Sequence, residues 1–174
     1  MLWSRKTSKP KVLLVEDNKL QADMTAAVIA ESGLYDVLIA YNGIEAFDVL
    51  ARHERGFNFL TNEIACILLD WQMPQMDGTS FLRELRTREA KSPFKRHTPV
   101  VIVSAYGDNE LRLKAEDSSH GLASAYLTKP IEESQLLHVL KRIVFDKEAE
   151  IMRELLLEQR LKLQQERPRQ ARSE

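Results

Sequence analysis

Short apolar runs that alternate with stretches of helical period constrain the fold of this chain more than any other feature. Five such runs have the length and the β-branched content of buried strands, at residues 12–15, 37–40, 65–69, 100–104 and 124–127. Helical patterns separate them, at residues 20–33, 43–52, 79–88 and 109–117. This alternation predicts an α/β fold in which helices cover both faces of a parallel sheet.

The first helical stretch carries a recurring set of apolar residues. Leu20, Met24, Ala27 and Val28 follow one another at steps of four, three and one residues, and the pattern ends near Gly33. We expect these four side chains to form one apolar stripe on the first helix.

A last helix is predicted from Ile131 onward, because no glycine or proline occurs again until Pro168. Its second half, over residues 149–163, follows a weak heptad pattern, so we expect this extended C-terminal helix to support a homodimer. The predicted organisation is a basic N-terminal tail at 1–10, one domain over 11–146, and an extension of the last helix with a disordered terminus over 147–174.

Composition narrows the classes of protein to which the chain can belong. With 44% apolar and 29% charged residues, it fits one globular domain that needs no disulfide. The balance of 25 basic against 26 acidic residues gives no electrostatic footprint for direct nucleic-acid binding. No apolar run reaches membrane-spanning length and the N-terminus lacks a secretory signal, so we expect a cytoplasmic location. Cys66, inside the third run, is expected to be a core residue.

Acidic side chains follow two of the predicted strands. Glu16 and Asp17 come directly after the first apolar run, and Asp70 comes directly after the third. Because the carboxyl ends of parallel strands share one edge of a sheet, the three carboxylates are expected to converge there. Their mutual repulsion is relieved either by protonation of one of them or by capture of a cation, and an oxygen-only ligand set of this kind suits Mg²⁺.

Two further residues complete a plausible phosphoryl site at the same edge. Ser104 ends the fourth predicted strand, and Lys129 lies just beyond the fifth. In this interpretation Asp70 is the nucleophile, Lys129 supplies a positive charge for phosphoryl oxygens, and Ser104 supplies a hydroxyl donor.

The same residues carry a family resemblance. The matching segments are Glu16-Asp17-Asn18, Asp70-Trp71-Gln72-Met73-Pro74-Gln75-Met76-Asp77-Gly78, Ser104-Ala105 and Tyr126-Leu127-Thr128-Lys129-Pro130. In this order and spacing, the chain resembles a response-regulator receiver domain of two-component signalling. The resemblance implies a flavodoxin-like, doubly wound five-stranded sheet with strand order 2-1-3-4-5.

The resemblance also implies roles for individual residues. Asp70 would accept a phosphoryl group from a sensor histidine kinase or a histidine phosphotransfer protein. Asp17, Asp70 and the backbone carbonyl of Gln72 would bind Mg²⁺, with Glu16 assisting through water. Such a chain catalyses only its own phosphorylation and dephosphorylation.

A conformational switch and an unusual peptide bond are implied as well. Lys129 and Ser104 would grip the phosphoryl oxygens, and Ser104 would move inward on phosphorylation. Tyr126 would then swing toward the vacated space and alter the surface of the fourth helix, fifth strand and fifth helix. The bond between Lys129 and Pro130 would be cis.

Simpler explanations exist for the same residues. Asp17 or Asn18 is of a type that often caps a helix, and Ser104 and Tyr126 are acceptable as ordinary polar positions on strands. Two other functions also remain open: a receiver-like scaffold that works without phosphorylation, and a Mg²⁺-dependent aspartyl phosphotransferase. The second needs an acid shortly after Asp70 to protonate a leaving group, and the amide of Gln72 occupies that place.

Overall fold

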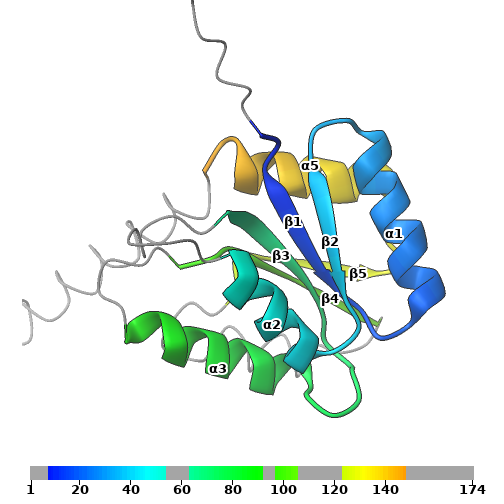
Figure 1. Cartoon of the computed structure of the whole chain (residues 1–174). Helices are drawn as coiled ribbons and strands as arrows, with labels where there is room; N and C mark the ends of the chain where they lie inside the picture. Colours follow the sequence, from blue (N-terminus) through cyan, green and yellow to red (C-terminus); the bar gives the residue numbers. More distant parts are fainter. Residues whose placement is uncertain (1–7, 54–62, 92–96, 106–122, 148–174) are drawn as a thin grey trace, which may run out of the picture.

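The computed structural model describes residues 8–53, 63–91, 97–105 and 123–147. Strands and helices alternate along the described ranges as the sequence pattern predicts, except between the last two strands, where residues 106–122 are not described (Figure 1). The elements are β1 (Lys11–Val15), α1 (Lys19–Glu31), β2 (Asp36–Ala40), α2 (Gly43–His53), β3 (Ile64–Asp70), α3 (Gly78–Ala90), β4 (Val100–Ala105), β5 (Ala125–Lys129) and α5 (Glu133–Val144).

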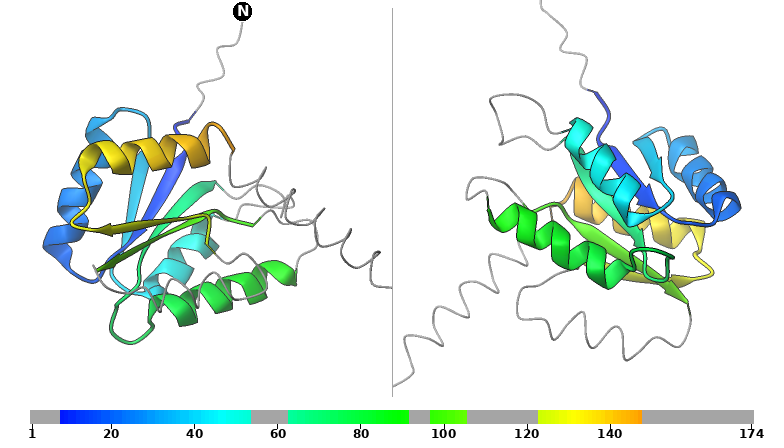
Figure 2. Two further views of the ribbon diagram at one scale, coloured as in Figure 1. Left: turned by 180° about the vertical axis from the view of Figure 1, so that it is seen from behind. Right: turned by 60° about the horizontal axis from the view of Figure 1, so that its bottom comes forward.

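The strands form one five-stranded sheet in the order β2-β1-β3-β4-β5, and every neighbouring pair is parallel. Figure 2 shows α1 and α5 along one face of this sheet and α2 and α3 along the other. The predicted α/β fold and its strand order 2-1-3-4-5 are therefore confirmed. The carboxyl ends of all five strands lie at one edge.

The core consists of two layers, one on each face of the sheet. Along β1, Leu13 and Val15 join the cluster beneath α2 and α3, whereas Val12 and Leu14 join the cluster beneath α1 and α5. Successive side chains of a strand point to opposite faces, and burial of both faces explains why β1, β3 and β4 are nearly continuous apolar runs. Cys66 is a free, buried thiol, as predicted, and burial raises its pKa to about 12.

The predicted apolar stripe of the first helix is wrong at three of its four members, because Ala27 is exposed as well as Leu20 and Met24. Leu20 is 69% exposed and Met24 is 63% exposed. Instead Ala22 and Ile29 are fully buried, and Ala26 packs partly against the same core. These three residues lie on one face of a helix, so a second apolar pattern in the same segment determines the buried face.

The last helix is shorter than the sequence predicts. It begins at Glu133, and its end at Val144 is followed by Phe145, whose N–H donates to the carbonyl of Lys141 at 2.9 Å. Lys147 then has a φ of 53°, in the left-handed region that ends helices. The prediction of one uninterrupted helix is therefore wrong at this point. Residues 149–163 and the predicted helix at 109–117 lie outside the described residues.

A buried ionic network anchors the C-terminal end of α3 to the start of β4. Glu89 is 1% exposed and accepts hydrogen bonds from the Arg86 guanidinium at 2.6 Å and from the Thr98 N–H at 2.8 Å. The guanidinium also donates to the Thr98 carbonyl at 3.0 Å.

None of the helices in the described ranges combines the length and hydrophobicity that a membrane span requires.

Candidate functional site

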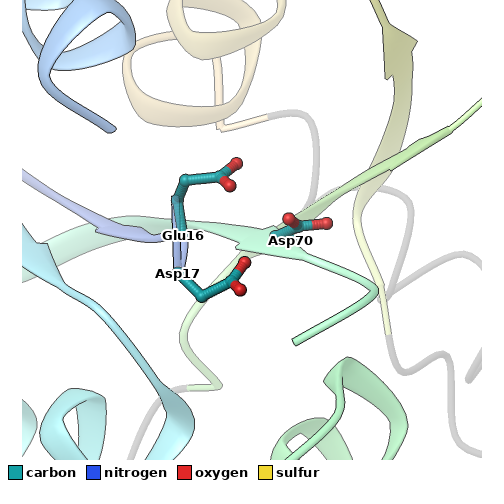
Figure 3. Close-up of side chains that lie close together, drawn as sticks. All are labelled: Glu16, Asp17 and Asp70. Carbon is teal, nitrogen blue, oxygen red and sulfur yellow. The ribbon is translucent and has the colours of Figure 1, made fainter. Parts of the chain in front are cut away.

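The predicted convergence of three carboxylates is confirmed. Glu16 and Asp17 directly follow β1, and Asp70 is the last residue of the adjacent strand β3. Figure 3 shows the three side chains at the ends of these strands, and one carboxylate oxygen of each lies within 4.8 Å of the others. Glu16 is 5% exposed and Asp70 is 6% exposed, whereas Asp17 is more exposed.

Lys129 reaches the acids from the end of β5, with β4 lying between its strand and β3. Its ammonium donates to Glu16 Oε2 at 2.7 Å and to Asp70 Oδ2 at 2.8 Å. A third hydrogen bond, of 3.1 Å, goes to the side-chain oxygen of Gln21 on α1. The bond between Lys129 and Pro130 is cis, as the resemblance implied.

Burial and charge act in opposite directions on these ionisable groups. Burial raises the pKa of Glu16, the negative charge of Asp70 adds to that increase, and the hydrogen bond from Lys129 works against it. For Lys129, burial alone would lower the pKa, but the bonds to Asp70 and Glu16 raise it overall. One ammonium against three carboxylates leaves the cluster with excess negative charge, which favours a cation.

Backbone groups hold the two buried acids in place. The N–H of Asn18 donates to Glu16 Oε1 at 3.3 Å, and the N–H of Gln72 donates to Asp70 Oδ1 at 3.2 Å. Asn18 also caps α1, because its side-chain oxygen accepts the N–H of Gln21 at 3.1 Å. The simpler explanation for Asn18 is thus correct, and the cap and the acidic cluster share one turn.

The segment after Asp70 turns back closely against the strand it leaves. The N–H of Gly78, the first residue of α3, donates to the Trp71 carbonyl at 3.0 Å. A Cβ atom on Gly78 would lie 2.8 Å from Trp71 Cε3 and 3.1 Å from the Asp70 carbonyl oxygen. Only glycine lets α3 begin so close to the backbone of Asp70.

Ser104 and Tyr126 lie on the two strands beyond β3. Ser104 is half-buried near the end of β4, where it is paired with Thr128, and the preceding residue Val103 is paired with Asp70. This register places Ser104 at the same edge as the acids. Tyr126 is paired with Ile102 and packs against the core beneath α2 and α3. The roles predicted for Ser104 and Tyr126 stay predictions, as does that of Gln72.

Gln21 is a site residue that the sequence argument missed. It lies in the first turn of the helix that follows the acidic pair, and its side chain reaches the Lys129 ammonium. The one available signal was its position, three residues after the helix cap at Asn18.

The donor set suits a hard divalent cation. The candidate ligands are carboxylate oxygens, and their separation of up to 4.8 Å is close to the roughly 4.2 Å that spans an ion with bonds of about 2.1 Å. Among the described residues, this group of Glu16, Asp17 and Asp70 therefore forms a site that can hold a metal ion.

Comparison with known proteins agrees with this geometry. Residues 12–141 match the family described as "Response regulator receiver domain". The chain is 35% identical over 133 residues to hybrid signal transduction histidine kinase B of Dictyostelium discoideum. This match covers 73% of this chain and 6% of the kinase. It is also 32% identical over 142 residues to the transcriptional regulatory protein CrdR of Helicobacter pylori. This match covers 82% of this chain and 58% of CrdR.

A solved structure shares the same fold. The receiver domain of a Francisella response regulator is 29% identical, with a TM-score of 0.62, and the match covers 80% of this chain and 98% of that one. Both curated relatives are longer than the region that matches, so this chain spans only part of each. With the acidic pocket at the predicted edge of the sheet, the chain belongs to the response regulator receiver domain family of two-component signalling.

Proposed function

We propose that Asp70 accepts a phosphoryl group from a phosphohistidine on a sensor histidine kinase or a histidine phosphotransfer protein. The observation that carries this proposal is the contact of 2.8 Å between the Lys129 ammonium and Asp70 Oδ2. An aspartate that is 6% exposed, at the rigid end of a strand and beside a fixed cation, has the environment that a phosphoryl acceptor needs.

The proposed transfer balances without a further reactant. An oxygen of Asp70 attacks phosphorus, an acyl phosphate forms, and the phosphorus–nitrogen bond of the phosphohistidine breaks. The electron pair of that bond returns to the imidazole of the donor, which takes up a proton from water. Lys129 and Ser104 then bind phosphoryl oxygens, the first as a point charge and the second as a hydroxyl donor.

We assign Mg²⁺ as the cation of the site. Asp17, Asp70 and the backbone carbonyl of Gln72 would hold it, and Glu16 would assist through water. When bound, Mg²⁺ supplies positive charge that offsets the repulsion between Asp70 and an incoming phosphoryl group.

Phosphorylation is proposed to act through a local change of packing. Ser104 would move toward the phosphoryl group and Tyr126 would follow, which would alter the surface formed by β5, α5 and the helix predicted at residues 109–117. The partial burial of both side chains supports this proposal, because neither is fixed in the fully buried core. In this account the chain acts on itself alone, as a switch, and binds no nucleic acid directly.

A homodimer through residues 149–163 is a separate proposal, supported by the heptad pattern of that segment. Light scattering of the full chain and of a variant that lacks residues 147–174 tests it. Light scattering should give the full chain twice the molar mass calculated from its sequence, and it should give the shortened variant the mass of a monomer. The same oligomeric state for both proteins would contradict the proposal.

The phosphoacceptor proposal is tested by incubation with acetyl phosphate and Mg²⁺ followed by intact mass measurement. We expect one phosphoryl adduct on the wild type and none on Asp70→Asn. Asp77→Asn is the matched control, because Asp77 lies in the same loop, is exposed and caps α3 through the Ser80 N–H, which asparagine also accepts. Continuous turnover of small phosphoesters would instead indicate the phosphotransferase, and no adduct on the wild type would indicate the scaffold.

A further inference from the structure

The Lys129 ammonium has a complete set of acceptors, and one of them is neutral. A lysine ammonium carries three N–H donors. In this structure they face Glu16 Oε2 at 2.7 Å, Asp70 Oδ2 at 2.8 Å and Gln21 Oε1 at 3.1 Å. Two of these acceptors are charged, whereas Gln21 accepts without adding charge to the cluster.

Local structure fixes the position of Gln21. Its N–H donates to the side-chain oxygen of Asn18, which caps α1, and the N–H of Asn18 in turn donates to Glu16 Oε1. The first turn of α1 is thus tied to the acidic cluster through its cap. A side chain from that turn therefore reaches the same ammonium that binds Glu16 and Asp70.

The two carboxylates that Lys129 binds are also proposed to interact with Mg²⁺. A cation that approaches Asp70 must share its oxygens with the ammonium, so the strength of the Lys129 pairing opposes metal binding. An acceptor that holds the ammonium from the α1 side without charge weakens that opposition and leaves Lys129 in place for a phosphoryl group.

We propose that Gln21 is a positioning residue, which holds the Lys129 ammonium and so sets how strongly Lys129 competes with Mg²⁺ for Asp70 and Glu16. This inference rests on the proposed function of the site. It assigns to the first turn of α1 a part in tuning the metal affinity, which Gln21 exerts through Lys129.

Two substitutions at the same position are predicted to have opposite effects. Gln21→Leu removes the acceptor, so the ammonium binds only the two carboxylates and the affinity for Mg²⁺ falls about two- to thirteenfold, the range of one net hydrogen bond. Gln21→Glu keeps the acceptor oxygen and attracts the ammonium more strongly, so the affinity rises. Leucine, glutamine and glutamate have similar helix propensities, so the free energy of unfolding should change little in either variant.

The experiment is a Mg²⁺ titration of the full chain, followed by the fluorescence of Trp71, which adjoins Asp70 and is 5% exposed. All variants carry Trp3→Phe, which removes the other of the two tryptophans. Met24→Glu is the control for added charge, because Met24 is exposed on the same helix and has no part in the site.

Opposite shifts for Gln21→Leu and Gln21→Glu, with a smaller shift for Met24→Glu, support the inference. The Mg²⁺ concentration that gives half the maximal rate of phosphorylation by acetyl phosphate should shift in the same direction as the fluorescence titration. Shifts in the same direction, no shift, or an equal effect of Met24→Glu overturn it. A wild type that shows no response to Mg²⁺ overturns the proposed function instead.

Discussion

Replacement of Lys129 by methionine separates the charge of its ammonium from the bulk of its side chain. In the wild type this ammonium is the ionic partner of Glu16 and Asp70, whose side chains are 7% and 8% exposed. Lys129→Met leaves two buried carboxylates facing each other without that cation. We therefore expect the variant to unfold more easily than the wild type in buffer without Mg²⁺.

The magnitude follows from the burial of the three side chains. Removal of one partner from a fully buried ion pair costs about 3–5 kcal/mol, because the other charge stays buried. The Lys129 side chain is 26% exposed, so water reaches the site and reduces the cost. We expect a loss of about 2–3 kcal/mol in the free energy of unfolding, below the fully buried range.

Urea unfolding at pH 7 with and without Mg²⁺ measures this effect. The loss should shrink in Mg²⁺, because a bound cation stabilises the folded state in place of the ammonium. Lys141→Met, at an exposed position on α5, is the control and should stay within about 0.5 kcal/mol of the wild type. A Lys129→Met protein as stable as the wild type without Mg²⁺ would refute the ionic pairing described here.

The same pair of proteins has a predicted dependence on alkaline pH. The pKa of Lys129 is raised above its ordinary value of 10.5, so the folded state holds this proton more tightly than the unfolded state does. The stability that the wild type gains over Lys129→Met is therefore fully present below pH 10.5 and decreases as the pH rises through the folded pKa. A difference that grows in this alkaline range would contradict the assignment.

Three further outcomes test other parts of the structure. Gly78→Ala should lose about 1–3 kcal/mol by overpacking against the backbone of the site and should slow phosphorylation, whereas Gly33→Ala, with open space around its Cβ, should leave the phosphorylation rate unchanged. Glu89→Leu should lose about 3–5 kcal/mol in urea unfolding, because it strands a buried guanidinium; a loss below about 1 kcal/mol would speak against that network. Burial raises the pKa of Glu16 in the folded state above 4.5. The stability of the wild type relative to Glu16→Gln, measured without Mg²⁺, should therefore fall as the pH rises from 4.5 through that pKa. An increase in relative stability over this pH range would contradict the raised pKa.

The fold was predictable because both faces of the sheet are buried. The central strands β1, β3 and β4 are nearly continuous apolar runs, and the runs that end in Val15 and Leu69 are followed at once by the acids. Since parallel strands end at one edge, the convergence of Glu16, Asp17 and Asp70 followed from chain order alone.

Features that depend on which face of a helix is covered were less predictable. Leu20 and Met24 fit a helical period, yet Ala22 and Ile29 face the sheet, and periodicity alone does not decide between two overlapping patterns. The end of α5 was missed because Lys147 adopts a left-handed conformation that glycine usually signals.

Contacts between distant segments were the least accessible to sequence reasoning. The contact of Gln21 with Lys129 joins residues 108 positions apart, and its geometry depends on how α1 packs beside the sheet. The residues around Gln21 form no pattern that predicts this contact, so the sequence analysis assigned no role to Gln21.

The central claim is that Asp70 carries the phosphoryl group, and the most direct measurement locates it chemically. Reduction of the acyl phosphate with borohydride converts the modified aspartate to homoserine, which peptide mass spectrometry assigns to one position. After incubation with acetyl phosphate and Mg²⁺, we predict homoserine at position 70 alone. Homoserine at another aspartate, or a phosphoryl group found on a histidine or serine, would contradict the account.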